Sequence, residues 1–145
     1  MNFLFKKVCI ASDHAGFNLK ENIKDFLINK HVSIIDLGPF KIKSVDYPDY
    51  AKKIANRIKS KKSDIGILVC GSGTGMAISA NKIKDIRAAV CYNPKSTRLS
   101  RQHNNANIIA LGARLTKKSL SLKLVELFLK TEFEGGRHLK RVKKI

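Results

Sequence analysis

The sequence predicts an α/β fold, namely a three-layer α/β/α sandwich with a doubly wound sheet of five parallel strands and a helical extension at the C-terminus. Two observations lead to this prediction. Short β-branched runs alternate with longer amphipathic runs five times along the chain. Parallel strands need crossovers, and helices in those crossovers cover both faces of the sheet. The length of 145 residues is usual for one domain with its own core, so we expect a single domain over residues 1–145.

The first two strand–helix units contain clear helix signals. The run KVCIAS (Lys7–Ser12) is typical of a buried strand, and Phe17–Asn29 has apolar residues at helical spacing. The second strand is predicted at VSIIDLG (Val32–Gly38), which leads into a turn-rich loop. Pro48 then stands where a helix would begin, because proline fits the first helical turn. Apolar residues recur at every fourth position after it: Tyr50, Ile54 and Ile58.

The last three units repeat this order. Their strands are predicted at DIGILVCG (64–71), IRAAVCY (86–92) and ANIIALG (106–112). Their helices are predicted at MAISANKI (76–83), from Pro94 toward His103, and along the run with Leu120, Leu124, Leu127 and Phe128. A double glycine after Glu132 interrupts the helical pattern, and Arg137–Ile145 is expected to form the helical extension.

The chain is strongly basic, with 29 Lys and Arg against 11 Asp and Glu and a formal net charge of +18. Such a balance favours nucleic acid or another polyanion as a partner. However, the lysines recur in pairs at the ends of predicted elements, and only the tail Arg137–Ile145 is densely basic. The chain has no nucleic-acid recognition motif. We expect no specific nucleic-acid partner, and a basic nucleic-acid-binding protein is the alternative from another functional class.

The cysteines and the hydropathy pattern bear on location. The three cysteines, Cys9, Cys70 and Cys91, have neither the paired spacing of a disulfide framework nor a CxxC zinc motif. No apolar stretch reaches the roughly 20 residues that a membrane span needs, and the first residues do not resemble a signal peptide. We therefore expect a cytoplasmic protein with reduced thiols and no membrane partner.

Candidate chemistry is expected where the strands end, because such folds bind ligands beyond the carboxyl ends of their strands. The loop CGSGTG (Cys70–Gly75) follows the third strand. Its glycines are spaced GxGxG rather than GxGxxG and no GKS or GKT follows, which excludes a dinucleotide fingerprint and a P-loop. A tight glycine turn without function is the alternative. The thiol favours a functional site, because amides at a helix N-terminus stabilise a thiolate.

Other polar residues are candidates to join Cys70 at the strand ends. Cys9 and Cys91 are expected to be buried apolar residues within strands. Asp13 and His14 follow the first strand, where a helix cap beside an exposed histidine is the alternative. The loop before the fifth strand carries a further histidine and an asparagine, His103 and Asn104.

Arg137 and Arg141 are four residues apart and therefore share a helix face. Two such arginines suit phosphate binding, although a solvated basic tail has the same pattern. The four histidines show no spacing of metal ligands. The candidate residues together favour a metal-free proton transfer on a small phosphorylated molecule.

Five segments resemble the type B ribose-5-phosphate isomerases and occur in the family's order. They are SDHAGF, DYPDYA, CGSGTGMAISANKIKDIRAAVC, SRQHNNANIIALGAR and FEGGRHLKRV. The resemblance runs from about Lys7 to Val142 and implies a Rossmann-like domain that forms homodimers, some of which pair into tetramers, with active sites shared at the dimer interface. The implied reaction interconverts D-ribose 5-phosphate and D-ribulose 5-phosphate in the pentose phosphate pathway, without metal or cofactor. Galactose-6-phosphate and allose-6-phosphate isomerases of the same family are the alternative.

The resemblance also implies catalytic roles. Cys70 would be the base that moves a proton between C2 and C1 of the open-chain sugar, and Met76 stands after the glycine loop rather than an acid. His103 of the partner subunit would open the sugar ring, with Asp13 near the ring oxygen or a hydroxyl. A hydroxyl and three backbone amides would stabilise the cis-enediolate: Ser72, Gly71, Gly73 and Gly75.

The remaining implied roles are substrate contacts. Tyr47 and Asn104 would contact sugar hydroxyls. The phosphate would be held by a histidine and by arginines that come largely from the partner subunit: His14, Arg114, Arg137 and Arg141.

Overall fold

The computed structural model describes residues 2–145 and contains a parallel sheet of five strands in the order β2-β1-β3-β5-β4. The strands are β1 (Val8–Ser12), β2 (Ile34–Asp36), β3 (Ile65–Cys70), β4 (Ala88–Val90) and β5 (Ile108–Gly112). The helices are α1 (Phe17–Asn29), α2 (Tyr47–Lys59), α3 (Thr74–Asn81), α4 (Pro94–Gln102), α5 (Lys118–Lys130) and α6 (Arg137–Val142). The predicted doubly wound α/β fold with a C-terminal helical extension is confirmed.

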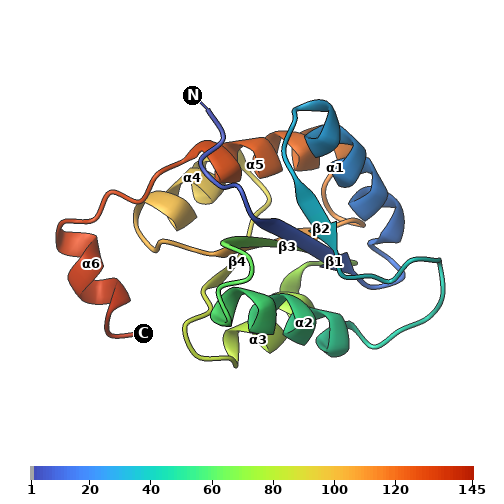
Figure 1. Cartoon of the computed structure of the whole chain (residues 1–145), viewed down its shortest axis with the longest axis horizontal. Coiled ribbons are helices and arrows are strands. Elements are labelled where there is room, and N and C mark those ends of the chain that lie inside the picture. The colour runs from blue at the N-terminus through green and yellow to red at the C-terminus, as the bar shows by residue number, and fades with distance from the viewer. Residues whose placement is uncertain (1) are drawn as a thin grey trace.

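The sheet is the middle of three layers (Figure 1). Helices α1, α4 and α5 cover one face, and α2 and α3 cover the other. Each face has its own apolar cluster, with Ile23 and Phe128 in the first and Ile54 and Met76 in the second. Because both faces are covered, every residue of β1, β3 and β5 is buried. Ligands therefore reach the central strands only at their ends.

The central elements agree with the sequence prediction, whereas the edge strands are shorter. α1 covers Phe17–Asn29 as predicted, and β1, β3 and β5 lie within the predicted runs. β2 and β4 keep three residues each. Both are edge strands with a single neighbour, so pairing supports them from one side only and ends early. α3 begins at Thr74, before the predicted Met76, because the loop after β3 is a short turn.

A buried lysine fixes the segment between β2 and α2. Lys20 of α1 is fully buried. Its Nζ lies 2.9 and 2.8 Å from the two carboxylate oxygens of Asp36 and 2.6 Å from the carbonyl oxygen of Pro39. Asp36 also accepts hydrogen bonds from Lys24 and from the amide of Gly38. Buried charges need such a complete set of partners, and this set holds the chain that leads into α2.

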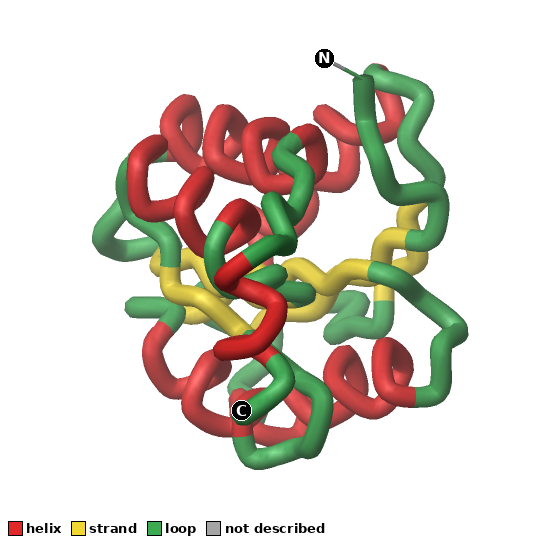
Figure 2. Tube along the Cα trace, turned by 90° about the vertical axis from the view of Figure 1, so that its left-hand side faces the viewer, coloured by secondary structure: helices red, strands yellow, loops and turns green. Residues whose placement is uncertain are grey.

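The C-terminal helix stands away from the three layers and is reached by the connector, residues 131–136 (Figure 1). Figure 2 faces this end of the molecule, with α6 in front of the sheet. Two hydrogen bonds fasten the connector to α4. Arg101 Nε donates to the carbonyl of Thr131 at 3.1 Å, and the amide of Glu134 donates to the carbonyl of Gln102 at 3.0 Å. The position of α6 is thus set through α4.

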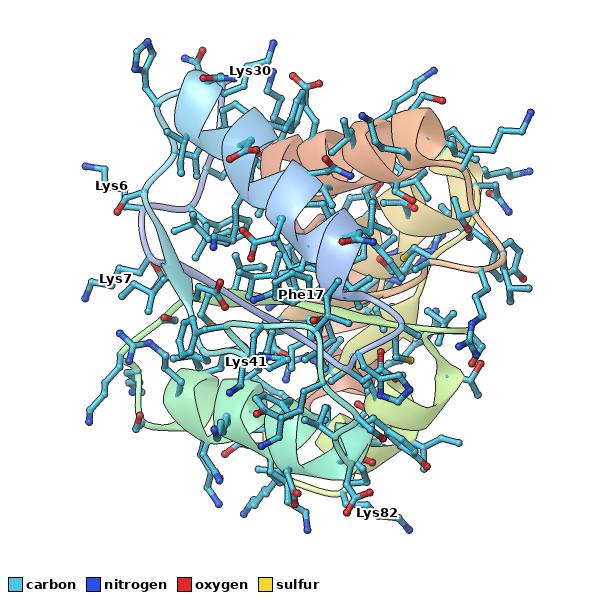
Figure 3. All side chains as sticks on the ribbon, turned by 90° about the vertical axis from the view of Figure 1, so that its right-hand side faces the viewer. Lys6, Lys7, Phe17, Lys30, Lys41 and Lys82 are labelled. Carbon is cyan, nitrogen blue, oxygen red and sulfur yellow. The ribbon has the colours of Figure 1, made fainter. Side chains whose placement is uncertain are left out.

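Exposed lysines occur on both helical layers and on α6. Figure 3 shows Lys6 and Lys7 projecting outward before β1, Lys30 at the end of α1, and Lys82 beyond α3. This view shows no gathering of the labelled lysines on one face. Over residues 2–145, none of the helices combines the length and apolar character of a membrane span.

Candidate active site

A pocket of about 440 Å³ opens at the carboxyl ends of β1, β3 and β5. Its lining comes from the loops after these strands and from the start of α2: Asp13, Tyr47, Cys70, Gly71, Ser72, Gly75, Arg114 and Leu115. From β1 the chain winds to β2 on one side and then to β3 on the other. Such a switch point is where doubly wound sheets bind ligands. A larger hollow of about 800 Å³ lies beside the connector, without a histidine or cysteine in its lining.

The turn after β3 directs backbone groups at a thiol. Cys70 is the last residue of β3 and is 5% exposed. Its Sγ accepts a hydrogen bond of 3.0 Å from the amide of Gly73. Gly73 has a φ of +80°, a conformation that a side chain would strain. α3 starts at the next residue, Thr74, whose amide donates to the hydroxyl of Ser72 at 3.2 Å. The thiol therefore lies at the N-terminus of a helix, as the sequence predicts.

The other two thiols are buried and lie outside the pocket, as the sequence predicts. Cys9 lies inside β1 and donates to the carbonyl of Ile65 at 3.5 Å. Burial raises the pKa of Cys9 to about 11, although contacts with Ser63 and Arg57 act in the opposite direction. Burial likewise raises the pKa of Cys91. Both thiols are held in the protonated, unreactive form, and neither lines the pocket.

Two side chains cover the glycine loop closely. The ring of Tyr47 packs on Gly75, so that a Cβ at this glycine would lie 2.6 Å from the ring. The guanidinium of Arg114 lies over Gly71, 3.2 Å from where a Cβ would be, while its own amide donates to the Gly71 carbonyl at 3.0 Å. Arg114 is exposed and has no salt bridge within residues 2–145. An uncompensated cation thus stands at the pocket that contains the thiol.

Asp13 lies both in the pocket and in the turn that leads into α1. It is 8% exposed and lines the pocket. Its Oδ1 also accepts a hydrogen bond of 2.9 Å from the amide of Gly16, which precedes α1. The neighbouring His14 is exposed, and its Nδ1 accepts a long hydrogen bond of 3.4 Å from the amide of Val45. Asp13 therefore fixes the turn before α1, whose N-cap is Gly16, and its carboxylate also lines the pocket.

A second group of titratable residues, the His103 cluster, consists of His103, Glu134 and His138. The two imidazole rings stack with their centroids 4.2 Å apart and their planes at 12°. Oε2 of Glu134 lies 4.0 Å from Nε2 of His103 and 3.6 Å from Nε2 of His138. The spacing of histidines along the chain gave no sign of this group, because α4, the connector and α6 each supply one residue.

The remaining predicted residues lie around this second group. Arg137 and Arg141 are exposed on α6 and form no salt bridge within residues 2–145. Asn104 lines a separate cavity of about 360 Å³. Within residues 2–145, the Cys70 pocket is lined by none of the following: His103, Asn104, Arg137 and Arg141. Figure 1 shows α6 at one end of the long axis and the loop between β2 and α2 at the other.

The two groups have complementary chemistry. The pocket offers a thiol, helix amides and a cation, which suit removal of a carbon-bound proton and stabilisation of an oxyanion. The His103 cluster offers imidazole acid–base groups beside two free guanidinium groups, which suit proton transfer to oxygen and binding of a phosphate. One chain does not bring the two groups into a single pocket.

Comparison with known families agrees with this chemistry. The sequence pattern of the ribose/galactose isomerase family matches residues 8–145. The chain belongs to this family. The resemblance that the sequence motifs indicate is thereby confirmed, and membership makes the chain an intramolecular oxidoreductase of the isomerase class.

Individual members of the family are similar over almost their whole length. Ribose-5-phosphate isomerase B of Escherichia coli (strain K12) is 43% identical over 140 residues, which cover 97% of this chain and 94% of that protein. The structure of ribose 5-phosphate isomerase from Thermotoga maritima superposes with a TM-score of 0.93 at 51% identity, covering 95% of each chain. The Mycoplasma genitalium ribose-5-phosphate isomerase B, solved with bound ribulose 5-phosphate, has a TM-score of 0.90 at 43% identity, covering 94% and 91%.

Sequence reasoning missed three residues of the two groups. Leu115 lines the pocket although it is 74% exposed, and its apolar side chain gives no chemical signal in the sequence. Glu134 and His138 join His103 through contacts between distant segments. The motif FEGGRH contains both residues. The family resemblance, however, implied a role for Arg137 within it and none for Glu134 or His138.

Proposed function

We propose that this chain interconverts D-ribose 5-phosphate and D-ribulose 5-phosphate with Cys70 as the base. The observation that carries the proposal is the Cys70 thiol, which accepts the Gly73 amide at a helix N-terminus and shares its pocket with Arg114. The relatives from three bacteria are named ribose-5-phosphate isomerases, and one was solved with ribulose 5-phosphate. No step of the proposed reaction requires a metal or a cofactor.

The proposed proton transfer starts from the open-chain aldose. The Cys70 thiolate removes the proton from C2, the electron pair of that bond forms the C1–C2 double bond, and O1 becomes the oxyanion of a cis-enediolate. The thiol then returns the proton to C1 while the proton of the O2 hydroxyl moves to O1, which leaves a ketone at C2. The hydrogen bond from the Gly73 amide holds the sulfur in place for this proton transfer.

Stabilisation of the enediolate is assigned to the turn between β3 and α3. The family resemblance implies that the amides of Gly71, Gly73 and Gly75 and the Ser72 hydroxyl face the oxyanion. In the unliganded fold the Gly73 amide instead donates to the thiol. Gly75 is in the first turn of α3, where backbone amides have no partner within the helix. We therefore assign the oxyanion to Gly71, Gly75 and Ser72, and the thiolate to Gly73.

We further propose that the active site is completed by a second copy of the chain in a homodimer. His103 would open the furanose ring, Asn104 would contact a sugar hydroxyl, and Arg137 and Arg141 would bind phosphate, yet these residues lie outside the Cys70 pocket of their own chain. Asp13 and Tyr47 line that pocket beside the base, where they can contact the sugar. His14 and Arg114 would meet the phosphate from the same side as the base.

Mixing two inactive variants tests the shared site. Cys70→Ala and His103→Asn are each expected to abolish turnover of ribose 5-phosphate. After co-refolding of equal amounts, about half of the dimers should be mixed. Each mixed dimer has one of its two sites with both residues intact, so about a quarter of the wild-type activity should return. If no activity returns although mass spectrometry detects mixed dimers, the shared site is excluded.

Assays of wild type on ribose 5-phosphate, galactose 6-phosphate and allose 6-phosphate decide between the pentose and the hexose phosphates.

A further inference from the structure

The His103 cluster is held together by backbone as well as side-chain contacts. The His103 amide donates to the Leu99 carbonyl at 2.9 Å as the C-cap of α4. The Glu134 amide donates to the carbonyl of Gln102, the residue before His103, at 3.0 Å. His138 lies in the first turn of α6, and its amide donates to the Gly135 carbonyl at 3.0 Å. These contacts place the carboxylate and the second imidazole against His103.

Burial differs between the two stacked rings. The side chain of His138 is 8% exposed, whereas that of His103 is 37% exposed. His138 is therefore the inner ring, and His103 presents its outer face and edge to solvent. A stacked neighbour restricts the χ2 rotation of an exposed ring, since any rotation breaks the contact between the faces.

The charges around His138 favour its neutral form. Desolvation lowers the pKa of His138, and the neighbouring His103, Arg137 and Arg141 lower it further, whereas Glu134 acts in the opposite direction. A neutral inner ring can stay stacked while the outer ring gains and loses a proton. The carboxylate of Glu134, 4.0 Å from Nε2 of His103, is the nearest negative charge to the outer ring.

The stacked geometry does not suit a metal ion, although the three side chains are all metal-ligand types whose ligand atoms lie within 4.8 Å of one another. An imidazole binds a metal along a lone pair that lies in the plane of the ring. Two stacked rings with planes only 12° apart point their lone pairs along nearly parallel planes, so one ion cannot lie in both. The cluster is better explained by an effect on His103 itself.

We infer that His138 and Glu134 are positioning residues for His103. They hold its imidazole in place for opening of the furanose ring of the sugar. This inference rests on the proposed function. In ring opening the O1 hydroxyl loses its proton, the bond between C1 and the ring oxygen breaks, and the ring oxygen takes up a proton. His103 exchanges these protons through its imidazole. The stack fixes the plane of His103, and the Glu134 carboxylate limits where the edge of that ring can lie.

The two sugars of the reaction separate this step from the carbon chemistry. Ribulose 5-phosphate cannot form a furanose ring, because its 5-hydroxyl is esterified. Enediolate formation from ribulose 5-phosphate therefore needs Cys70 and needs no ring opening. In D₂O this half-reaction appears as exchange of deuterium into C1, which proton NMR follows directly, whereas consumption of ribose 5-phosphate requires both steps.

His138→Ala is expected to lower kcat on ribose 5-phosphate about tenfold, a fraction of the roughly hundredfold or more that a well-placed acid–base group contributes. The deuterium exchange of ribulose 5-phosphate should stay within about twofold of wild type. His138→Phe keeps the stack and should restore most of the loss, and Glu134→Gln should show a smaller loss confined to ribose 5-phosphate. Lys140→Ala, an exposed neighbour on α6, is the matched control and should resemble wild type.

Three results would overturn the inference. Equal loss of both rates in His138→Ala would give His138 a structural role for α6. Unchanged rates in both His138→Ala and Glu134→Gln would remove any influence on His103. Failure of His138→Phe to restore the loss would exclude stacking as the cause. Failure of the proposed function is distinguishable, because wild type would then neither consume ribose 5-phosphate nor exchange deuterium into ribulose 5-phosphate.

Discussion

The Cys70 pocket and the His103 cluster are built in different ways. The pocket stands on β1, β3 and β5, whose residues are all buried, and backbone amides supply much of its chemistry. The His103 cluster stands on the end of α4, the connector and α6, and its chemistry comes from side chains, of which Glu134 is 50% exposed. The pocket is thus fixed by the core of the fold, and the cluster by a few local contacts.

This difference matches the demands of the two proposed steps. Removal of a proton from carbon needs a fixed oxyanion site, since stabilisation depends on donors that are already in place. Ring opening and phosphate binding use side-chain acid–base groups and cations, which the end of α4, the connector and α6 supply. Variants that change one region alone should therefore separate the two steps.

Removal of the thiol should have the largest effect. Cys70→Ala is expected to lower kcat by about a thousandfold or more, because it removes the proposed base from the N-terminus of α3. Circular dichroism and gel filtration should match wild type, since alanine fits the end of β3. Cys91→Ala removes a buried thiol outside the pocket and is the matched control. Near-normal turnover by Cys70→Ala in a coupled assay would reject the assignment of the base.

Removal of an α6 arginine should act on substrate binding. Arg137→Ala is expected to raise KM about tenfold with little change in kcat, because a phosphate contact present in both ground and transition states contributes uniform binding. Steady-state kinetics measure both constants, and Lys140→Ala controls for the loss of one positive charge on the same helix. An unchanged KM for Arg137→Ala would place this residue outside the phosphate site.

Removal of the buried ammonium should affect stability more than activity. Lys20→Met leaves Asp36 with Lys24 and the Gly38 amide as partners and should lower the free energy of unfolding at pH 7 by about 3 kcal/mol. Urea titration followed by circular dichroism measures this difference. An exposed control, Lys6→Met, should change it little. A variant as stable as wild type would show that the pair adds nothing net to folding.

The pH dependence of that difference has a definite sign. Burial raises the pKa of Asp36, but hydrogen bonds from Lys20, Lys24 and Gly38 outweigh burial and lower it overall. A lowered folded-state pKa contributes stability that is complete above the unfolded value of about 4 and is lost as the pH falls through the folded value. The stability difference between wild type and Lys20→Met should therefore shrink below about pH 4. A difference that grows in acid would contradict this account.

Removal of metal ions should have no effect. Neither proposed step uses a metal, and the stacked rings of the His103 cluster do not suit one. Dialysis against EDTA should leave kcat and KM unchanged, as measured in the same coupled assay with a metal-independent coupling system. Activity that is lost in EDTA and returns with a divalent ion would show that the chemistry of one of the two regions has been misassigned.

The two regions were not equally predictable from the sequence. The strand-end rule and the motif around Cys70 located the pocket, because most of its residues follow strands directly and the topology brings the strand ends together. Asp13, Ser72 and Arg114 line it from the loops after strands, and Tyr47 lines it from the start of α2. The edge strands β2 and β4 are shorter than predicted. Their length could not be predicted because apolar patterning does not reveal which strands have a single neighbour.

The His103 cluster could not be predicted because it depends on how α6 returns to α4. The connector is held there by Arg101, a buried arginine that bonds to the carbonyls of Thr131 and Ala106 rather than to an acid. No spacing rule reports a contact of this kind. The sequence identified His103 through its motif, whereas the stack on His138 and the proximity of Glu134 needed the three-dimensional arrangement.

The reactivity of the buried Lys20 toward amine-directed reagents also depends on local opening of the fold. Amine-directed reagents acylate a lysine only when its unprotonated amine is exposed to water. Among residues 2–145, Lys20 is the one lysine that is buried, and three hydrogen bonds hold its ammonium group. Labelling at Lys20 therefore proceeds only in molecules whose α1 and β2 segments have separated, so its rate measures how often this corner of the fold opens.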